Sequence, residues 1–127
     1  MLWELRVMRK MNFVKKMLWF KMNYKEVSKI KSKEILKGFD AKLIHSDNFT
    51  LSFVTIEANA ELPEHAHIHE QITQITEGEL ELTINGETKV FVPGMVAIIP
   101  SNVKHSGRAL TACKVTDIFY PVREDYK

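Results

Sequence analysis

The chain has 127 residues, of which 45% are hydrophobic and 27% are charged. This composition predicts one globular domain and excludes a chain that is disordered throughout. The net charge of +2 is too small to indicate nucleic-acid binding, and no apolar run approaches the roughly 20 residues of a membrane-spanning helix. The only cysteine, Cys113, excludes an intramolecular disulfide, so we expect a free thiol and a reducing, cytoplasmic setting.

The first 21 residues differ from the rest in charge. They carry six Lys or Arg against one acid, whereas residues 22–127 carry 12 bases against 15 acids. Charges are scattered through this stretch and no small-residue cleavage site follows, so a secretory signal is not expected. We expect residues 1–21 to be a basic N-terminal extension and residues 22–127 to be the folded domain. An amphipathic helix that docks on a membrane surface or a partner, and translation that starts at Met11 or Met22, are the alternatives.

The first part of the expected domain begins with an ambiguous stretch. Residues 25–37 alternate weakly and predict either a short helix or an edge strand. Residues 41–45 and 49–57 are rich in Phe, Thr, Val and Ile, and Asp47-Asn48 between them are turn formers. This pattern predicts a β-hairpin.

The later residues continue as strands and turns. Leu80, Leu82 and Ile84 recur at every second position, which predicts a strand with one buried face. Asn85-Gly86 tolerates positive φ at both residues and predicts a tight hairpin. Turn residues recur roughly every eight to twelve residues, as in an antiparallel sandwich or small barrel. We therefore expect an all-β fold, with strands at residues 71–76, 79–84, 88–92, 95–99, 105–110 and 112–120.

Four of the five histidines fall in two short segments, His65, His67 and His69 in one and His105 in the other. In an extended segment alternate side chains share a face, so His65 and His67 can aim at one point. Neutral imidazoles bind divalent transition metals, which makes this pair half of a mononuclear site. No HExxH pattern is present, so a helical zinc-protease site is not expected. The residues that remain open as further ligands are His69, Glu70, Gln71 and His105.

Together these segments resemble the two motifs of the cupin family. The first motif is similar to HxHxxx(E/Q) followed after six residues by glycine, which residues 65–71 and Gly78 match. The second motif is a turn glycine, a Pro-Gly turn and a histidine near the start of the following strand, which Gly86, Pro93-Gly94 and His105 match. The resemblance covers residues 38–122. It implies an antiparallel double-stranded β-helix, or jelly-roll barrel, around one metal, and it supports the expectation of a homodimer that pairs exposed strand edges.

The cupin resemblance also implies the ligands. They are His65, His67, Gln71 and His105, around one divalent transition metal such as Ni, Zn, Mn, Fe or Cu. Most cupins have glutamate where this chain has Gln71, so the site is more positive by one charge and leaves the metal a stronger Lewis acid. His69 is expected to lie near the mouth of the barrel rather than to bind metal, and Glu70 to point away from it.

The C-terminal residues resemble a narrower group of single-domain cupins. Asp117 to Tyr126 match the ending DxFxPxREDY, and one cupin of that group acts in pectin and alginate breakdown by linearising unsaturated uronates. The resemblance implies active-site roles for Asp117, Phe119 and Arg123. Chemically, Asp117 can move a proton and Arg123 can hold a substrate carboxylate. The alternatives are Phe119 as a core residue and Asp117–Arg123 as a structural ion pair.

Three functions follow as hypotheses. The first is a metal-dependent enzyme that opens or isomerises a small carboxylated sugar such as 4,5-unsaturated galacturonate, with Asp117, Phe119 and Arg123 as catalytic residues. The second is a cupin dioxygenase that uses Fe or Cu and O₂. The third is a non-catalytic module that binds or senses a small molecule. All three predict a small-molecule partner and none predicts nucleic acid.

Overall fold

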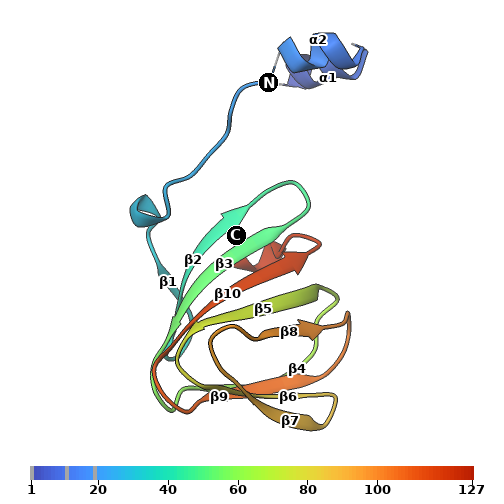
Figure 1. The fold of residues 1–127 in the computed structure, drawn as a ribbon. Coiled ribbons are helices and arrows are strands. Elements are labelled where there is room, and N and C mark those ends of the chain that lie inside the picture. The colour runs from blue at the N-terminus through green and yellow to red at the C-terminus, as the bar shows by residue number, and fades with distance from the viewer. Residues whose placement is uncertain (1, 11, 19) are drawn as a thin grey trace.

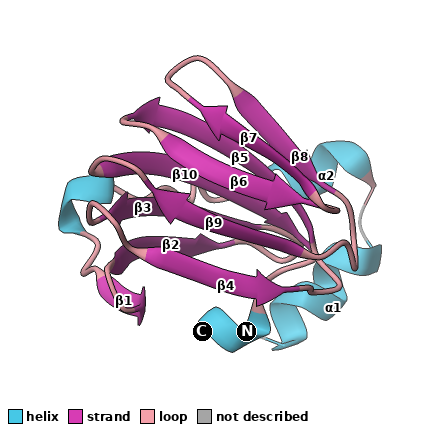
Figure 2. Cartoon of the chain, turned by 90° about the horizontal axis from the view of Figure 1, so that it is seen from below, coloured by secondary structure: helices cyan, strands magenta, loops and turns pink. Residues whose placement is uncertain are grey.

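The computed structural model describes residues 2–10, 12–18 and 20–127. Ten strands form two antiparallel sheets that face each other, as Figures 1 and 2 show. The strands are β1 (Lys33–Leu36), β2 (Phe39–His45), β3 (Thr50–Ile56), β4 (Glu61–His65), β5 (Glu70–Glu77), β6 (Leu80–Ile84), β7 (Glu87–Phe91), β8 (Val96–Ile99), β9 (His105–Ala109) and β10 (Cys113–Tyr120). The six-stranded sheet has the order β1-β2-β3-β10-β5-β8 and the four-stranded sheet the order β4-β9-β6-β7. The predicted all-β jelly-roll fold is confirmed.

The inward faces of the strands divide the barrel interior into an apolar end and a polar end. Along β3 the buried positions change from Thr50 and Ser52 to Val54 and Ile56. The antiparallel neighbour β10 pairs Asp117 with Ser52. Its other neighbour, β5, places Thr73 opposite the same Asp117. Side chains at paired positions point to the same face of a sheet, so the polar residues of three strands meet at one end of the barrel.

Two predicted turns have clear physical reasons. Asn85 and Gly86 join β6 to β7 with φ of 49° and 82°, a conformation that glycine and asparagine adopt readily. Gly78, the motif glycine between β5 and β6, has φ of 84°. A Cβ atom at Gly78 would overlap the carbonyl oxygen of Ala112, so glycine is required there for space as well as for conformation.

The structure differs from the sequence prediction in two segments. Residues 25–37 contain both expected elements, a short 3-10 helix (Val27–Lys29) followed by β1. Strand β4 was not predicted, because its side chains show no regular alternation of burial and it contains Pro63. Proline is tolerated there because β4 lies at the edge of the four-stranded sheet. Since β4 ends at His65, His67 lies in the following loop rather than on the same strand.

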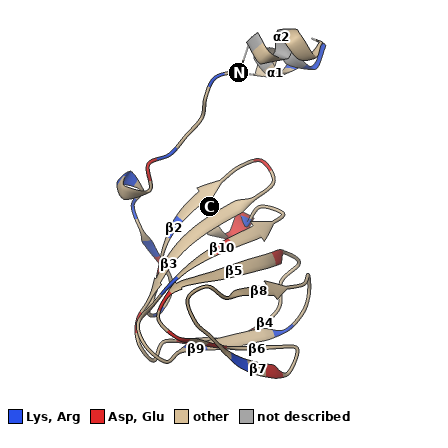
Figure 3. Ribbon diagram, in the orientation of Figure 1, with Lys and Arg blue, Asp and Glu red and all other residues tan. Residues whose placement is uncertain are grey.

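The N-terminal segment forms two helices, α1 (Leu2–Lys10) and α2 (Phe13–Leu18). They lie away from the barrel and join it through an extended segment (Figure 1), and Leu2, Trp3 and Phe13 are exposed. Figure 3 shows basic residues along the chain that leads from these helices to β1. None of the described helices is long and apolar enough to span a membrane. The domain boundary between residues 21 and 22 stays a prediction.

Candidate metal centre

Three histidines converge at the polar end of the barrel. His65 ends β4 and pairs directly with His105, the first residue of β9, while His67 reaches the same point from the loop after β4. One ring nitrogen from each lies within 4.8 Å of the other two, which makes this a group of described residues able to hold a metal ion. The convergence of His65, His67 and His105 therefore agrees with the sequence prediction.

Backbone carbonyl groups fix the protonation of all three rings. The Nδ1 atoms of His65, His67 and His105 donate hydrogen bonds of 2.9 Å to the carbonyl oxygens of Pro63, His69 and Val103, respectively. Each ring therefore carries a proton on Nδ1 and, in its neutral form, presents Nε2 as the atom that can bind a metal. Burial, with the charge of Arg123 adding to it, lowers the pKa of His67 to about 4. Burial also lowers the pKa of His105, so both rings are neutral at pH 7.

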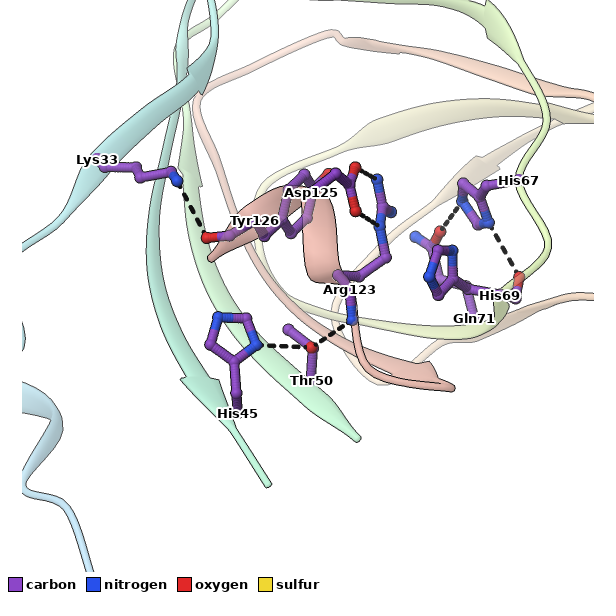
Figure 4. Close-up of polar contacts among 9 residues, drawn as sticks. All are labelled: Lys33, His45, Thr50, His67, His69, Gln71, Arg123, Asp125 and Tyr126. Atoms are coloured by element: carbon purple, nitrogen blue, oxygen red, sulfur yellow. Dashed lines mark hydrogen bonds and ion pairs between the residues drawn. The ribbon is translucent and has the colours of Figure 1, made fainter. Parts of the chain in front are cut away.

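The side-chain oxygen of Gln71 points toward His67, in an arrangement that a bound cation would stabilise. Its Nε2 donates to Thr73 Oγ1 at 2.9 Å and to Asp117 Oδ1 at 3.4 Å, which turns its oxygen toward the histidines. Gln71 Oε1 lies 3.1 Å from His67 Nε2 (Figure 4), and because the Nδ1 proton of His67 is donated to the carbonyl oxygen of His69, the neutral ring has a lone pair at Nε2. His105 Nε2 is buried and has no hydrogen-bond partner among the described residues. These facing lone pairs fit a divalent transition metal held by three imidazoles and one amide oxygen.

Asp117 is joined by hydrogen bonds to Gln71, a candidate metal ligand, and to Thr73. Thr73 Oγ1 donates to Asp117 Oδ1 at 2.6 Å, and Gln71 Nε2 donates to the same oxygen. Burial raises the pKa of Asp117 to about 6, although both hydrogen bonds and the charge of Arg123 favour its ionised form. A partly buried carboxyl with this pKa can take up and release a proton near neutral pH.

Arg123 is buried beside this group but does not pair with Asp117. Its Nε and Nη2 donate to the two carboxylate oxygens of Asp125 at 3.0 and 2.7 Å. Its guanidinium carbon lies 4.7 Å from the ring centre of Phe119 and 4.0 Å from that of Tyr126. The structural ion pair of Arg123 is therefore with Asp125, in place of the Asp117–Arg123 pair considered from the sequence.

A small cavity brings the predicted groups together. It has a volume of about 70 Å³, and its lining includes His65, His105, Gln71, Asp117, Phe119 and Arg123. Phe119 is buried, with its ring edge-on to that of His67, so it is at once a core residue and part of the cavity wall. Small-molecule sites generally span at least about 300 Å³. A ligand the size of a sugar therefore enters only if part of the cavity wall moves.

The remaining polar residues of these motifs lie around the cluster. His69 is buried with its ring edge-on to Phe119, and its Nδ1 has no partner. Glu70 is exposed, as expected. Thr73 and Tyr126 line the cavity but were not singled out from the sequence. Thr73 could have been found from the period of two, because it shares a strand face with Gln71.

Comparison with known proteins identifies the family. The sequence profile described as "Cupin domain" matches residues 52–119, more than half of the chain. The chain belongs to the cupin family. No curated protein matches it significantly. The match spans the predicted ligands and extends to Phe119, so this cupin carries its histidine cluster inside the region that defines the family.

Solved structures share the cupin fold at low sequence identity. An RmlC-like cupin from Shewanella frigidimarina is 24% identical, with a TM-score of 0.79, over 84% of this chain and 97% of that one. KdgF from Halomonas sp. is also 24% identical with a TM-score of 0.79, over 84% of this chain and 100% of that one. Ectoine synthase from P. lautus is 22% identical with a TM-score of 0.72, over 80% of each chain.

Proposed function

We propose that residues 22–127 form a metal-dependent isomerase that opens the ring of a small unsaturated sugar acid such as 4,5-unsaturated galacturonate. One observation carries the proposal. A chain of hydrogen bonds runs from Gln71, beside His67, through Thr73 to Asp117, whose pKa is raised to about 6. A proton-transfer group is thereby coupled to a candidate metal ligand inside one cavity, which Arg123 also lines.

The proposed reaction is an isomerisation and needs no co-reactant. A divalent ion held by His65, His67, His105 and Gln71 would supply Lewis acidity to a substrate oxygen. Ionised Asp117 takes the proton of the anomeric hydroxyl, the bond from the anomeric carbon to the ring oxygen breaks, and an aldehyde and an enolate form. Asp117 then gives the proton to the alkene carbon that does not bear the former ring oxygen, which converts the enolate into a ketone.

Arg123 has the second role in this proposal. Its guanidinium is buried at the cavity wall, and among the described residues Arg123 is the only lysine or arginine that lines the cavity. A uronate carries a carboxylate, which a buried arginine binds through paired N–H groups. The DxFxPxREDY ending supports the choice of substrate class, because it resembles cupins of pectin and alginate breakdown.

The test of this function is conversion of 4,5-unsaturated galacturonate by the metal-loaded protein, followed by proton NMR. We expect loss of the alkene signal and growth of keto-product signals well above the spontaneous rate. Oxygen uptake without isomerisation would instead favour a cupin dioxygenase. Salicylate 1,2-dioxygenase from Pseudoaminobacter salicylatoxidans shares the fold with a TM-score of 0.64 and is 20% identical, over 68% of this chain and 28% of that one. Sugar binding without turnover would favour a non-catalytic module.

We further propose that the protein forms the expected homodimer, but through the outer face of the six-stranded sheet rather than by pairing strand edges. Paired positions there carry apolar residues across five strands, and three of these residues are exposed by 38–66%. The row consists of Ile44, Leu51, Ile118, Ile72 and Ile98. Exposed apolar rows of this length are typical of interfaces.

Placing a charge in this row is expected to dissociate the dimer. Ile98→Glu puts a carboxylate at a position that is 66% exposed on the edge strand β8, whereas Ile68→Glu does the same at a 63% exposed position outside the row. Light scattering should give twice the 14.7 kDa chain mass for the wild type and Ile68→Glu, and the monomer mass for Ile98→Glu. A monomeric wild type, or equal behaviour of the two variants, would contradict the proposal.

A further inference from the structure

The guanidinium of Arg123 is held on three sides by the C-terminal segment and β10. Asp125 binds one edge of it, while the rings of Phe119 and Tyr126 lie against its faces. The side chain of Arg123 is only 8% exposed, whereas that of Asp125 is 57% exposed. Asp125 therefore holds the guanidinium from its more exposed side, and in Figure 4 the guanidinium of Arg123 lies between Asp125 and His67.

The geometry of arginine determines what this contact leaves available. The guanidinium has five N–H donors in a fixed plane, and Asp125 takes one on Nε and one on Nη2. The end-on pair, with one N–H on Nη1 and one on Nη2, lies on a different edge from the one that Asp125 occupies. Arg123 lines the cavity and Asp125 does not, so the carboxylate that occupies the side-on edge lies outside the cavity lining.

The backbone of this segment is anchored independently of Asp125. The amide of Arg123 donates to Thr50 Oγ1 at 2.8 Å, and Thr50 also contacts His45 Nδ1 at 2.8 Å. Lys33 Nζ donates to the carbonyl oxygen of Tyr126 at 3.0 Å. Loss of the Asp125 carboxylate therefore leaves these anchors in place and changes mainly the orientation of the guanidinium.

We propose that Asp125 is a positioning residue that turns the end-on N–H pair of Arg123 into the cavity, where it receives the carboxylate of the substrate. This inference rests on the carboxylated substrate of the proposed function. The proposal specifies which edge of the Arg123 guanidinium binds the substrate. The edge that binds substrate is the end-on edge, because Asp125 already occupies the side-on edge.

The test compares binding of galacturonate and galactose, which differ in the carboxylate, to the metal-loaded protein by NMR titration. Asp125→Asn should weaken galacturonate binding about tenfold, which is about 1.4 kcal/mol, and leave galactose binding unchanged. Asp125→Glu should restore most of the loss. Glu124→Gln is the matched control, because Glu124 lies on the same 3-10 helix (Glu124–Tyr126) and its carboxylate pairs with Lys127 rather than with Arg123.

Kinetics separate this inference from the proposed function. With an active enzyme, Asp125→Asn should raise KM and leave kcat nearly unchanged. If the wild type shows no turnover but binds galacturonate in a way that depends on Asp125, the isomerase is contradicted and the positioning role of Asp125 is retained. The positioning role is overturned if the wild type does not bind galacturonate, if Asp125→Asn leaves its binding unchanged, or if both sugars are weakened equally.

Discussion

His105→Ala is expected to abolish metal binding, with an affinity loss of more than about 100-fold. Mutating a residue that only hydrogen-bonds to a metal ligand typically costs about 10- to 100-fold. His105 contributes a buried Nε2 atom with no other partner, fixed in place by the bond from Nδ1 to Val103. Removing it leaves two imidazoles and Gln71. Elemental analysis should find about one transition metal per wild-type chain and almost none in the variant.

His45→Ala is the control for this experiment. His45 lies at the end of β2, contacts Thr50, and is outside the histidine cluster, so the variant should keep its metal. Thermal unfolding gives a second measurement that does not depend on metal recovery. Metal at 100 times its dissociation constant should stabilise the wild type by about 2.7 kcal/mol and have little effect on His105→Ala. Full metal occupancy in His105→Ala would show that the ion binds elsewhere.

Asp117→Asn is expected to lower kcat by about 10²- to 10⁴-fold, the range for loss of a general acid–base group. The amide keeps an oxygen that can accept hydrogen bonds from Thr73 and Gln71, so the geometry around the metal ligands is preserved. Metal content and galacturonate binding should therefore match the wild type. Retained turnover in Asp117→Asn would remove Asp117 from the mechanism.

The raised pKa of Asp117 gives this prediction a pH signature. Burial raises the pKa of Asp117 to about 6 in the metal-free protein, and a bound cation would lower it, so wild-type activity that needs the ionised carboxylate should rise with pH up to about 6 at most and then level off. Stability changes in the opposite direction. The folded protein favours the protonated form, so this contribution is fully present below pH 3.8, the unfolded value, and is lost as pH rises through 6.

A stability measurement on the metal-free protein checks this sign. The shift from 3.8 to about 6 corresponds to a cost of about 3 kcal/mol for the ionised wild type. Asp117→Asn carries no such charge, so denaturant unfolding should find it more stable than the wild type at pH 8. The difference should vanish below pH 4. A variant less stable than the wild type at pH 8 would show that the carboxylate is stabilised, not penalised, by its surroundings.

The sequence predicted the elements whose information is local. The alternation of Leu80, Leu82 and Ile84 and the Asn85-Gly86 turn were sufficient to place the β6–β7 hairpin. The motif spacing correctly grouped His65 and His67 with a distant His105. Strand β4 was missed because it lies at a sheet edge, where neither face needs a regular apolar pattern.

The parts of the site that escaped prediction depend on long-range pairing. The contact from Gln71 through Thr73 to Asp117 exists because β5 and β10 pair with Thr73 opposite Asp117, and residue periodicity alone does not reveal this register. The partner of Arg123 was also hidden. Arg123 directly precedes the C-terminal 3-10 helix and Asp125 lies in it, and the local pattern of the sequence did not predict this helix or the pair it forms.

The most direct test of the central claim is the rate of conversion of 4,5-unsaturated galacturonate by one preparation in three states: metal-loaded, stripped by a chelator, and reloaded. The account predicts that the alkene NMR signal disappears rapidly with the loaded protein, at the spontaneous rate with the stripped protein, and rapidly again after reloading. Equal rates in all three states, with metal content verified, would contradict a metal-dependent isomerase.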